Sequence, residues 1–540
     1  MMRFNRPTAD VYTTSSVKRT ASKAFGKNSF LMMMVLVATL FGPRLSAAAK
    51  SCESLSSLGL TNGTITLAEM VAAGALKPSA NERIVEGGRV PNYAGLPAFC
   101  RVQANLRPSP DSDIRMELWM PVSESWNRKF LGIGNGGLGG GAGMNPAPLA
   151  NAIRMGYAGA SNNTGHDGDS SYALGHPEKI KDFGYRSVHE MTVVAKDLMK
   201  QYYGSGPRLS YVAGGGGAAI AGLSSAQRYP ADYDSVAVTG MASYFTRQTF
   251  GQMWIWQATH KDKASFIPPA KYAVLHNAAL AGCDATDGLK DGIIGDPEGC
   301  QFDPAVTLCK DVDAQDCLTA PQVEAAKKIY SGPHNPRTGT EIYSPMYPGS
   351  ELGWGPLAGG DEPFPVPIEF FKYFVFRDPN WNYKRRPVNF DSDLQLADNP
   401  ENAPMDSVAP DLGRFFSRGG KLLLIGGWSD NLIPPKISIN YYRAVVAKVG
   451  PKKASESLRF FMVPGMLHGP GTGGAENFDF DSLSLLTGWK EDHKVPDQLI
   501  VRHYKGGTQV GSRLVCQYPQ IARYQGSGNT EDPSNYVCKR

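Results

Sequence analysis

The stretch SYVAGGGGAAIAGLSSAQR, residues 210–228, decides the fold. Its first four residues are typical of a buried strand, four glycines follow, and an Ala-rich segment ending at Arg228 predicts a helix. Earlier strand segments at 129–131 and 157–160 also run into Gly-rich turns, and apolar residues recur at helical spacing over 186–203. Strands that alternate with helices from about Cys52 onward predict a mostly parallel sheet covered on both faces.

The pattern continues with a strand at 235–239 and resumes with strands at 421–425 and 459–463. Between them the composition changes, because this part of the sequence contains an Asp/Gly cluster, many prolines and four of the eight cysteines. A chain of 540 residues is long enough for two or three domains, or for one large domain with an insertion. We therefore expect a core in two parts, 50–240 and 416–540, with an inserted domain at 241–415.

The first 49 residues have the pattern of a secretory signal peptide. Residues 1–28 are basic, an apolar run (30–41) follows, and the segment ends in SAAA (46–49). The apolar run is short for a membrane anchor, although an uncleaved anchor stays an alternative because the basic region is long. We expect a secreted or periplasmic protein that begins near Lys50 and does not associate with a membrane after cleavage.

Composition excludes several classes of protein. With 42% hydrophobic residues the chain is too apolar for disorder. The net charge of +5 is a weak bias over this length, and no concentration of basic residues is visible outside the first thirty. We therefore expect no nucleic-acid partner. An even number of cysteines in an exported chain predicts disulfides, whose connectivity the count alone leaves open.

Two Gly-rich turns invite a dinucleotide-binding interpretation. GIGNGG (132–137) matches the G-x-G-x-x-G motif, but no Asp or Glu lies between it and His166 to hold a ribose. GGGGAA (214–219) is followed by Asp232 and Asp234, which precede the next strand instead of ending it. The nucleotide interpretation is therefore disfavoured. Gly-rich loops that only pack tightly are the plain alternative.

The order of the parts favours an α/β-hydrolase core that is interrupted by the inserted domain. A strand–turn–helix at the four glycines stands where that fold carries its nucleophile, Asp430 follows a later strand, and His468 follows the next. A lone loop histidine is more often structural, but the joint order favours His468 as general base, oriented by Asp430. Gly136 and Gly217 are the candidate N–H donors of an oxyanion hole.

Ten segments, taken in their order along the chain, resemble segments of the tannase/feruloyl esterase family, which also contains mono(2-hydroxyethyl) terephthalate hydrolase. The resemblance implies a secreted serine esterase for gallate- or ferulate-type aromatic esters, with an α/β-hydrolase core, an inserted lid and a calcium ion in that lid. The segments are LPAFCRV (96–102), GNGGLGG (134–140), NNTGHDG (162–168), VHE (188–190), AQRYPADYD (226–234), CDATDGLKDGIIGDP (283–297), PQVEAAKKIYSGP (321–333), GSELGW (349–354), GGWSDNLIPP (426–435) and FFMVPGMLHG (460–469).

The calcium prediction has its own chemical basis. Asp284, Asp287 and Asp291 lie close together, with Gly288 and Gly292 permitting tight turns, and clustered carboxylates suit a hard cation. A solvated acidic turn is the plain alternative. The spacing is not that of an EF-hand, so we expect a structural role. The resemblance implies a ligand set made of those three side chains and the backbone oxygens of Leu289 and Ile293.

The family's nucleophile is missing from this chain. The family elbow resembles G-C-S-x-G-G, its His is followed by Cys, and the two cysteines are joined. Here Gly216 stands at the nucleophile position, and Gly215 and Gly469 stand at the two cysteine positions. Without an oxygen or sulfur nucleophile no acyl-enzyme forms. Ser224 and Ser225 lie two turns along the predicted helix, too far away to substitute.

Three hypotheses follow. The chain is a family member of very low or no serine-esterase activity that still binds a small aromatic ester or acid. Alternatively, it is a hydrolase in which His468, oriented by Asp430, activates a water molecule. In the third case it is a binding or scaffold protein unrelated to esters. The first two predict a lidded pocket at His468, and the third does not require one.

Other residues are assigned more loosely. We expect His166 and Asp167 to lie near the pocket. Five aromatic residues of the insert could stack on an aromatic acid, although core packing is the commoner role; they are Trp254, Trp256, Trp354, Phe370 and Phe371. The resemblance also implies four disulfides, Cys52–Cys100, Cys283–Cys300, Cys309–Cys317 and Cys516–Cys538.

Overall fold

The computed structural model describes residues 49–540, apart from 78–92, 135–137, 139–145, 217 and 472–475. The predicted signal peptide therefore lies outside the described residues, except for its last position. The two candidate oxyanion-hole residues, Gly136 and Gly217, also lie outside them. No helix of the described part is both long enough and apolar enough to cross a membrane.

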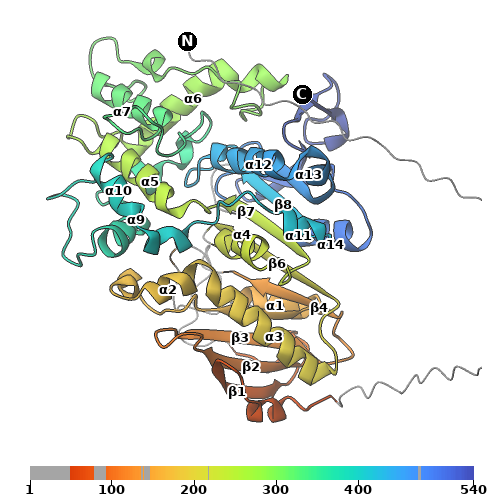
Figure 1. Ribbon diagram of the computed structural model, residues 1–540. Coiled ribbons are helices and arrows are strands. Elements are labelled where there is room, and N and C mark those ends of the chain that lie inside the picture. The colour runs from red at the N-terminus through yellow and green to blue at the C-terminus, as the bar shows by residue number, and fades with distance from the viewer. Residues whose placement is uncertain (1–48, 78–92, 135–137, 139–145, 217, 472–475) are drawn as a thin grey trace, which may run out of the picture. The chain divides into compact units, whose positions relative to one another are not determined.

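A nine-stranded sheet organises the chain (Figure 1). Its strands are β1 (Gly63–Val71), β2 (Phe99–Leu106), β3 (Ile114–Pro121), β4 (Lys129–Ile133), β5 (Ala158–Asn162), β6 (Leu209–Gly216), β7 (Ser235–Met241), β8 (Lys421–Gly427) and β9 (Leu458–Val463). Their order is β1-β2-β3-β5-β4-β6-β7-β8-β9. The six strands from β5 to β9 in that order are parallel, which confirms the predicted α/β-hydrolase core.

The first three strands depart from the prediction. Strand–turn–helix repeats were expected from about Cys52, but β1, β2 and β3 pair antiparallel with one another, and β3 is antiparallel to β5. The reason lies in β2, where Val102, Ala104 and Leu106 are buried and the residues between them are partly exposed. Such alternation is typical of an antiparallel sheet with one face packed on the core.

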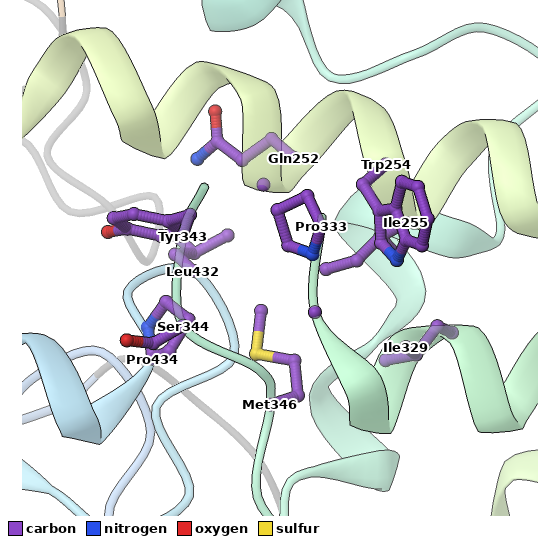
Figure 2. Close-up of a pocket in the computed structure, with 12 residues that line it drawn as sticks. Gln252, Trp254, Ile255, Ile329, Pro333, Tyr343, Ser344, Met346, Leu432 and Pro434 are labelled. Atoms are coloured by element: carbon purple, nitrogen blue, oxygen red, sulfur yellow. The ribbon is translucent and has the colours of Figure 1, made fainter. Parts of the chain in front are cut away.

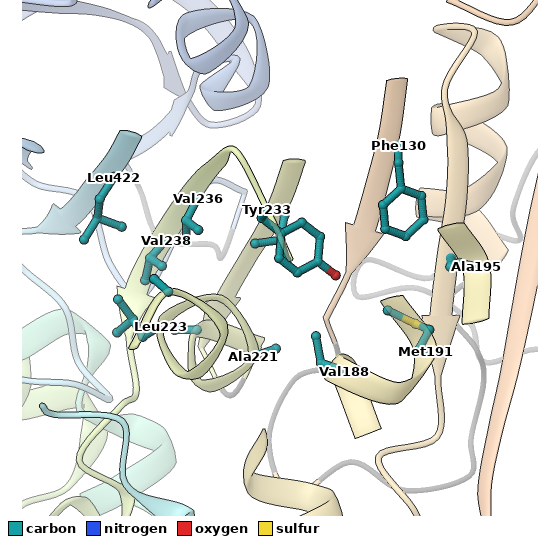
Figure 3. Packing of buried hydrophobic residues seen from close by; sticks show 14 of the residues in the cluster. Phe130, Val188, Met191, Ala195, Ala221, Leu223, Tyr233, Val236, Val238 and Leu422 are labelled. Atoms are coloured by element: carbon teal, nitrogen blue, oxygen red, sulfur yellow. The ribbon is translucent and has the colours of Figure 1, made fainter. Parts of the chain in front are cut away.

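Helices cover both faces of the sheet. They are α1 (Pro146–Arg154), α3 (Ser187–Tyr203), α4 (Ala218–Arg228), α12 (Pro435–Val449), α13 (Pro451–Ser457) and α14 (Ser482–Glu491). The short helix α2 (Pro177–Lys181) packs instead against the segment between β7 and β8, where its Ile180 joins the cluster of Phe370 and Phe371. Figure 3 shows Val188 and Met191 of α3 on the side of Phe130 of β4, and Leu223 of α4 beside Val236 and Val238 of β7. Ala237, between those two valines, packs in a second cluster with α1 and α14. Residues of one strand thus alternate between two cores.

Between β7 and β8 the chain forms a mainly helical segment, gathered beside the end of β7 in Figure 1. Its helices are α5 (Phe245–Thr259), α6 (Tyr272–Cys283), α7 (Ala320–Ser331), α8 (Gly355–Ala358), α9 (Pro365–Phe370), α10 (Ser392–Ala397) and α11 (Gly413–Ser417). Trp354, Phe370 and Phe371 are fully buried in its two apolar clusters, so core packing is their role. Trp254 and Trp256 are partly exposed.

The last part of the chain adds short strands and completes the disulfides. The strands are β10 (Glu476–Asp479), β11 (Gln498–Lys505), β12 (Thr508–Cys516), β13 (Ile521–Tyr524) and β14 (Tyr536–Lys539). All four predicted disulfides are confirmed: Cys52–Cys100, Cys283–Cys300, Cys309–Cys317 and Cys516–Cys538. No cysteine is left free. The longest loop, closed by Cys52–Cys100 across 48 residues, restricts the unfolded chain most in the chain-entropy account.

Candidate active site

Gly216 ends β6 in a sharp turn into α4. Its φ is +53°, a left-handed conformation that glycine adopts without steric cost. The turn is tightly packed, because a Cβ on Gly214 would lie 2.8 Å from Ala218 Cβ, and one on Gly134 would lie 2.7 Å from the same atom. The strand–turn–helix geometry is that of a hydrolase nucleophile elbow. Of the four glycines, Gly216 therefore has a conformational reason to be glycine.

The acid and the base form a hydrogen-bonded pair at the ends of the neighbouring strands. His468 Nδ1 lies 3.1 and 3.0 Å from the two carboxylate oxygens of Asp430. The carboxylate is 2% exposed and accepts the backbone N–H groups of Leu432 and Ile433 at 2.9 Å each. An ionised carboxylate only accepts, so we assign the proton to Nδ1, which makes Nε2 the acceptor nitrogen.

The elbow at Gly216 lies directly against the Asp430–His468 pair. A Cβ built on Gly216 would lie 2.9 Å from His468 Nε2. Nonbonded carbon and nitrogen atoms normally pack at roughly 3.5 Å or more, so the imidazole occupies part of the space that a side chain at 216 would need. The structure thus brings together Gly216, Asp430 and His468, as the sequence predicted. It places an imidazole, 19% exposed, directly against a residue without a side chain.

Two glycines that the sequence did not point to, Gly240 and Gly427, pack closely against the segment 466–468. Gly240, with φ +55°, lies so close that a Cβ there would be 2.4 Å from His468 O and 3.0 Å from the ring. A Cβ built on Gly427 would lie 2.1 Å from the carbonyl oxygen of Met466. The Ser429 N–H donates to that same oxygen at 3.1 Å. Gly240 directly follows the strand predicted at 235–239, Gly427 lies two residues after the strand predicted at 421–425, and these positions were the available signal.

Residues 100–539 match the tannase and feruloyl esterase family. The chain belongs to this family. It is 34% identical over 557 residues to an uncharacterized esterase of Xanthomonas campestris, with 94% of this chain and 95% of that protein covered. A crystal structure of feruloyl esterase B from Aspergillus oryzae superposes with a TM-score of 0.81 at 30% identity, covering 90% of this chain and 99% of that one. Tannin acyl hydrolase from Aspergillus niger, at 19% identity and a TM-score of 0.73, shares the fold.

A small cavity lies beside the loop that carries the acid of this esterase-family site. Figure 2 shows Gln252, Tyr343, Met346, Leu432 and Pro434 among the side chains around it. Its water-accessible volume is about 10 Å³, which is room for roughly one water molecule and not for an aromatic acid. Burial raises the pKa of Tyr343, and the charge of Asp430 adds to this shift. This cavity therefore borders the acid without being a substrate pocket.

His166 and Asp167 have different surroundings. His166 is 3% exposed, stacks on Tyr172 at 3.7 Å, and its Nε2 lies 3.1 Å from the carbonyl oxygen of Leu138, in the Gly-rich segment after β4. Burial lowers the pKa of His166 to about 4, so the ring is neutral at pH 7. Asp167 pairs with Arg115 and is half-exposed. His166 thus contacts the segment that carries Gly136, whereas Asp167 forms a surface ion pair.

The serines after the elbow serve the helix. Ser224 and Ser225 are 1% and 2% exposed, and their hydroxyls donate to the carbonyl oxygen of Ala221 at 3.2 and 2.8 Å. Both side chains are therefore engaged with their own helix and buried in it. Neither offers a hydroxyl to His468.

The loop for which the sequence predicts a calcium ion starts at the end of α6. Its carboxylates accept backbone N–H groups within the loop: Asp284 from Asp291 and Gly292 at 3.3 and 3.1 Å, Asp287 from Leu289 at 3.0 Å, and Asp291 from Ile293 at 3.1 Å. Arg513 also pairs with Asp291. Burial, followed by the charges of Asp291 and Asp284, raises the pKa of Asp287 to about 6. In the described ranges no three acidic, histidine or cysteine side chains are gathered tightly enough to form a metal site by themselves.

Proposed function

We propose that this esterase-family chain binds a gallate- or ferulate-type aromatic ester or acid at the carboxyl edge of its sheet. The segment 241–415 acts as a lid over that edge, and serine-esterase activity is very low or absent. The observation that carries the proposal is the juxtaposition of Gly216 with His468 Nε2. The backbone of an elbow and its acid–base pair are present, and the attacking atom is not.

The reason for low activity is chemical. A serine esterase splits ester hydrolysis into acylation and deacylation, and acylation requires a hydroxyl that gives its proton to the histidine. Gly216 has none, and the nearby hydroxyls of Ser224 and Ser225 are engaged. Sites that lose the nucleophile keep roughly 10³–10⁴-fold acceleration over water from binding and oxyanion stabilisation. Binding and slow turnover are therefore compatible in one site.

One observation favours a second candidate, in which His468 activates a water molecule. The imidazole is oriented by Asp430 and is 19% exposed, so water can reach the ring. As general base, Nε2 would take a proton from the water while its oxygen attacks the ester carbon. This route forms no acyl-enzyme and therefore gives no burst.

Assays of the purified wild-type chain separate these candidates. We expect saturable binding of ferulate or gallate, and turnover of methyl ferulate and methyl gallate far below that of a serine esterase. If His468→Ala removes the remaining turnover and leaves ferulate binding intact, the water route is supported. If turnover is unchanged by His468→Ala, the residual activity belongs to binding alone. If neither ferulate nor gallate binds, the proposal that this chain binds an aromatic ester or acid is refuted.

We further propose that the loop 284–293 holds one calcium ion with a structural role, and that the chain is secreted or periplasmic. The donor chemistry supports the ion, because the three carboxylates and the carbonyl oxygens of Leu289 and Ile293 are all hard oxygen ligands within one short loop. A bound cation there supplies charge neutralisation and fixes the loop beside β12. The four disulfides support an oxidising compartment.

Calcium removal tests the structural role. A ligand present at a hundred times its Kd stabilises a fold by about 2.7 kcal/mol, so EGTA should lower the melting temperature and added Ca²⁺ should restore it. Asp287→Asn should abolish this dependence, whereas Asp311→Asn, an exposed carboxylate outside the loop, should preserve it. Equal melting temperatures for the wild type with EGTA and with Ca²⁺ would refute a structural ion.

A further inference from the structure

A cleft of about 610 Å³ lies at the edge of the sheet opposite the candidate active site. Its walls come from α3, the loop after α4, α11 and α13. The loop after α4 leads into the amino end of β7, α11 leads into that of β8, and α13 leads into that of β9. The candidate site is built at the carboxyl ends of parallel strands of the same sheet. The lining residues include His189, Arg228, Tyr229, Asp232, Arg414, Ser417, Arg418 and Lys453.

The cleft is strongly positive. Four lining residues are cationic, Arg228, Arg414, Arg418 and Lys453, and one lining residue is acidic, Asp232. That carboxylate is already engaged, since it lies 2.7 Å from His189 Nδ1. No local sequence pattern indicates this concentration of charge, because the four cations are spread from position 228 to position 453.

None of these cations is paired with a carboxylate in the described part of the chain. The Arg228 guanidinium lies 4.3 Å from the centre of the Tyr185 ring, and Lys453 Nζ donates to the neutral Ser417 hydroxyl at 2.6 Å. Arg414 and Arg418 have no ion pair with any described residue. Burial lowers the pKa of the neighbouring Lys196, and the charge of Arg418 adds to this shift. Cations facing one cleft repel one another unless an anion lies between them.

We propose that this cleft binds a small organic anion carrying two or three carboxylate or phosphate groups. Guanidinium groups match both kinds of oxyanion, because their planar N–H donors bind two oxygens at once. Four cations against one engaged carboxylate favour a ligand with more than one negative group. The cleft is also large enough for a molecule of drug-like size. This site shares no residue with Gly216, Asp430 or His468, so it is independent of the proposed esterase-family function.

Calorimetric titration of the full chain tests the proposal. The probes are tricarballylate, which carries three carboxylates, and fructose 1,6-bisphosphate, with acetate as the monovalent control, all at constant ionic strength. We expect one-site saturable binding of at least one polyvalent probe and none of acetate. Saturation by only one probe identifies whether carboxylates or phosphates are preferred.

Paired variants locate the binding. Arg414→Gln with Arg418→Gln should weaken the affinity at least tenfold. The matched control, Lys310→Gln with Arg385→Gln, removes two exposed positive charges outside the cleft and should change it less than twofold. His468→Ala should leave it unchanged. The proposal is overturned if neither probe saturates, if both double variants weaken binding equally, or if the affinity simply follows salt concentration.

Discussion

The two halves of the candidate site differ in how completely they are built. In the acid–base half, Asp430 is buried and satisfied by two backbone N–H groups and by His468. In the nucleophile half, Gly216 keeps the backbone of an elbow without a side chain. Each half has its least costly structure. A buried carboxylate needs its partners, whereas a residue at φ +53° is least strained as glycine.

This contrast shows that the backbone of an elbow and an acid–base pair can be present without a nucleophilic side chain between them. Removing His468 would leave a buried carboxylate without its main partner, so the pair is retained for structural reasons as well as chemical ones. The elbow has no such dependence on serine. A non-glycine residue in the left-handed region costs roughly 1–2 kcal/mol, so glycine at position 216 relaxes the turn.

The largest effect is expected from supplying the missing half. Gly216→Ser should raise kcat/KM for methyl ferulate by at least roughly a hundredfold, since a triad nucleophile is worth up to about 10⁶-fold in kcat. The gain is limited because the imidazole, 2.9 Å from the new Cβ, must move aside. Gly206→Ser, in open space, is the matched control and should gain nothing.

Adding Gly215→Cys and Gly469→Cys should raise this activity further by restoring the family's active-site bridge. A new Cβ at 215 would lie 3.1 Å from the carbonyl oxygen of Thr239, so a small local shift is required. If the triple variant folds, binds ferulate and remains as slow as the wild type, the two halves do not form one site.

The second prediction concerns His166, which lies against Leu138 in the Gly-rich segment after β4. Unlike His468, it pairs with no carboxylate of the described residues, and its folded pKa of about 4 lies below the unfolded value of 6.5. Its neutral form is therefore favoured by folding. This contribution is fully present above pH 6.5 and is lost as pH falls towards 4, with a limit of about 3 kcal/mol.

Urea unfolding of wild type and His166→Gln at pH 7 and pH 4.5 measures this contribution. The wild type should lose more free energy of unfolding on acidification than the variant does. His176→Gln, which removes a histidine that is exposed and paired with Asp111, is the control and should behave like the wild type. Identical acid sensitivity of wild type and His166→Gln would contradict a buried neutral ring.

The smallest effect is expected at Gly240, which links the halves. Gly240→Ala places a Cβ 2.4 Å from the carbonyl oxygen of His468 in a left-handed conformation, and should lower stability by at least roughly 1–2 kcal/mol, because that carbonyl must also shift. In the Gly216→Ser background it should also lower kcat more than it raises KM, because it displaces the base. Gly282→Ala, inside α6 with open space around it, should lower neither stability nor kcat, because alanine is the better helix former.

Local sequence patterns predicted the helices and parallel strands of the core and the residues at their ends. The Ala-rich run gave the helix at 218–228, and the order of strand ends placed Gly216, Asp430 and His468 together. The antiparallel β1–β3 region was missed because its signal is side-chain alternation, not a Gly-rich turn. The contact of Gly240 with His468 joins residues far apart in the chain, and no local pattern encodes such a contact. The basic cleft was hidden for the same reason.

The most direct test of the central claim is intact-protein mass after treatment with a fluorophosphonate, which labels activated serines. We expect no adduct on the wild type and one adduct on Gly216→Ser, lost again in Gly216→Ser with His468→Ala. One stoichiometric adduct on the wild type, together with loss of its methyl ferulate turnover, would show that another serine acts as nucleophile and would refute the proposed lack of a nucleophile at this site.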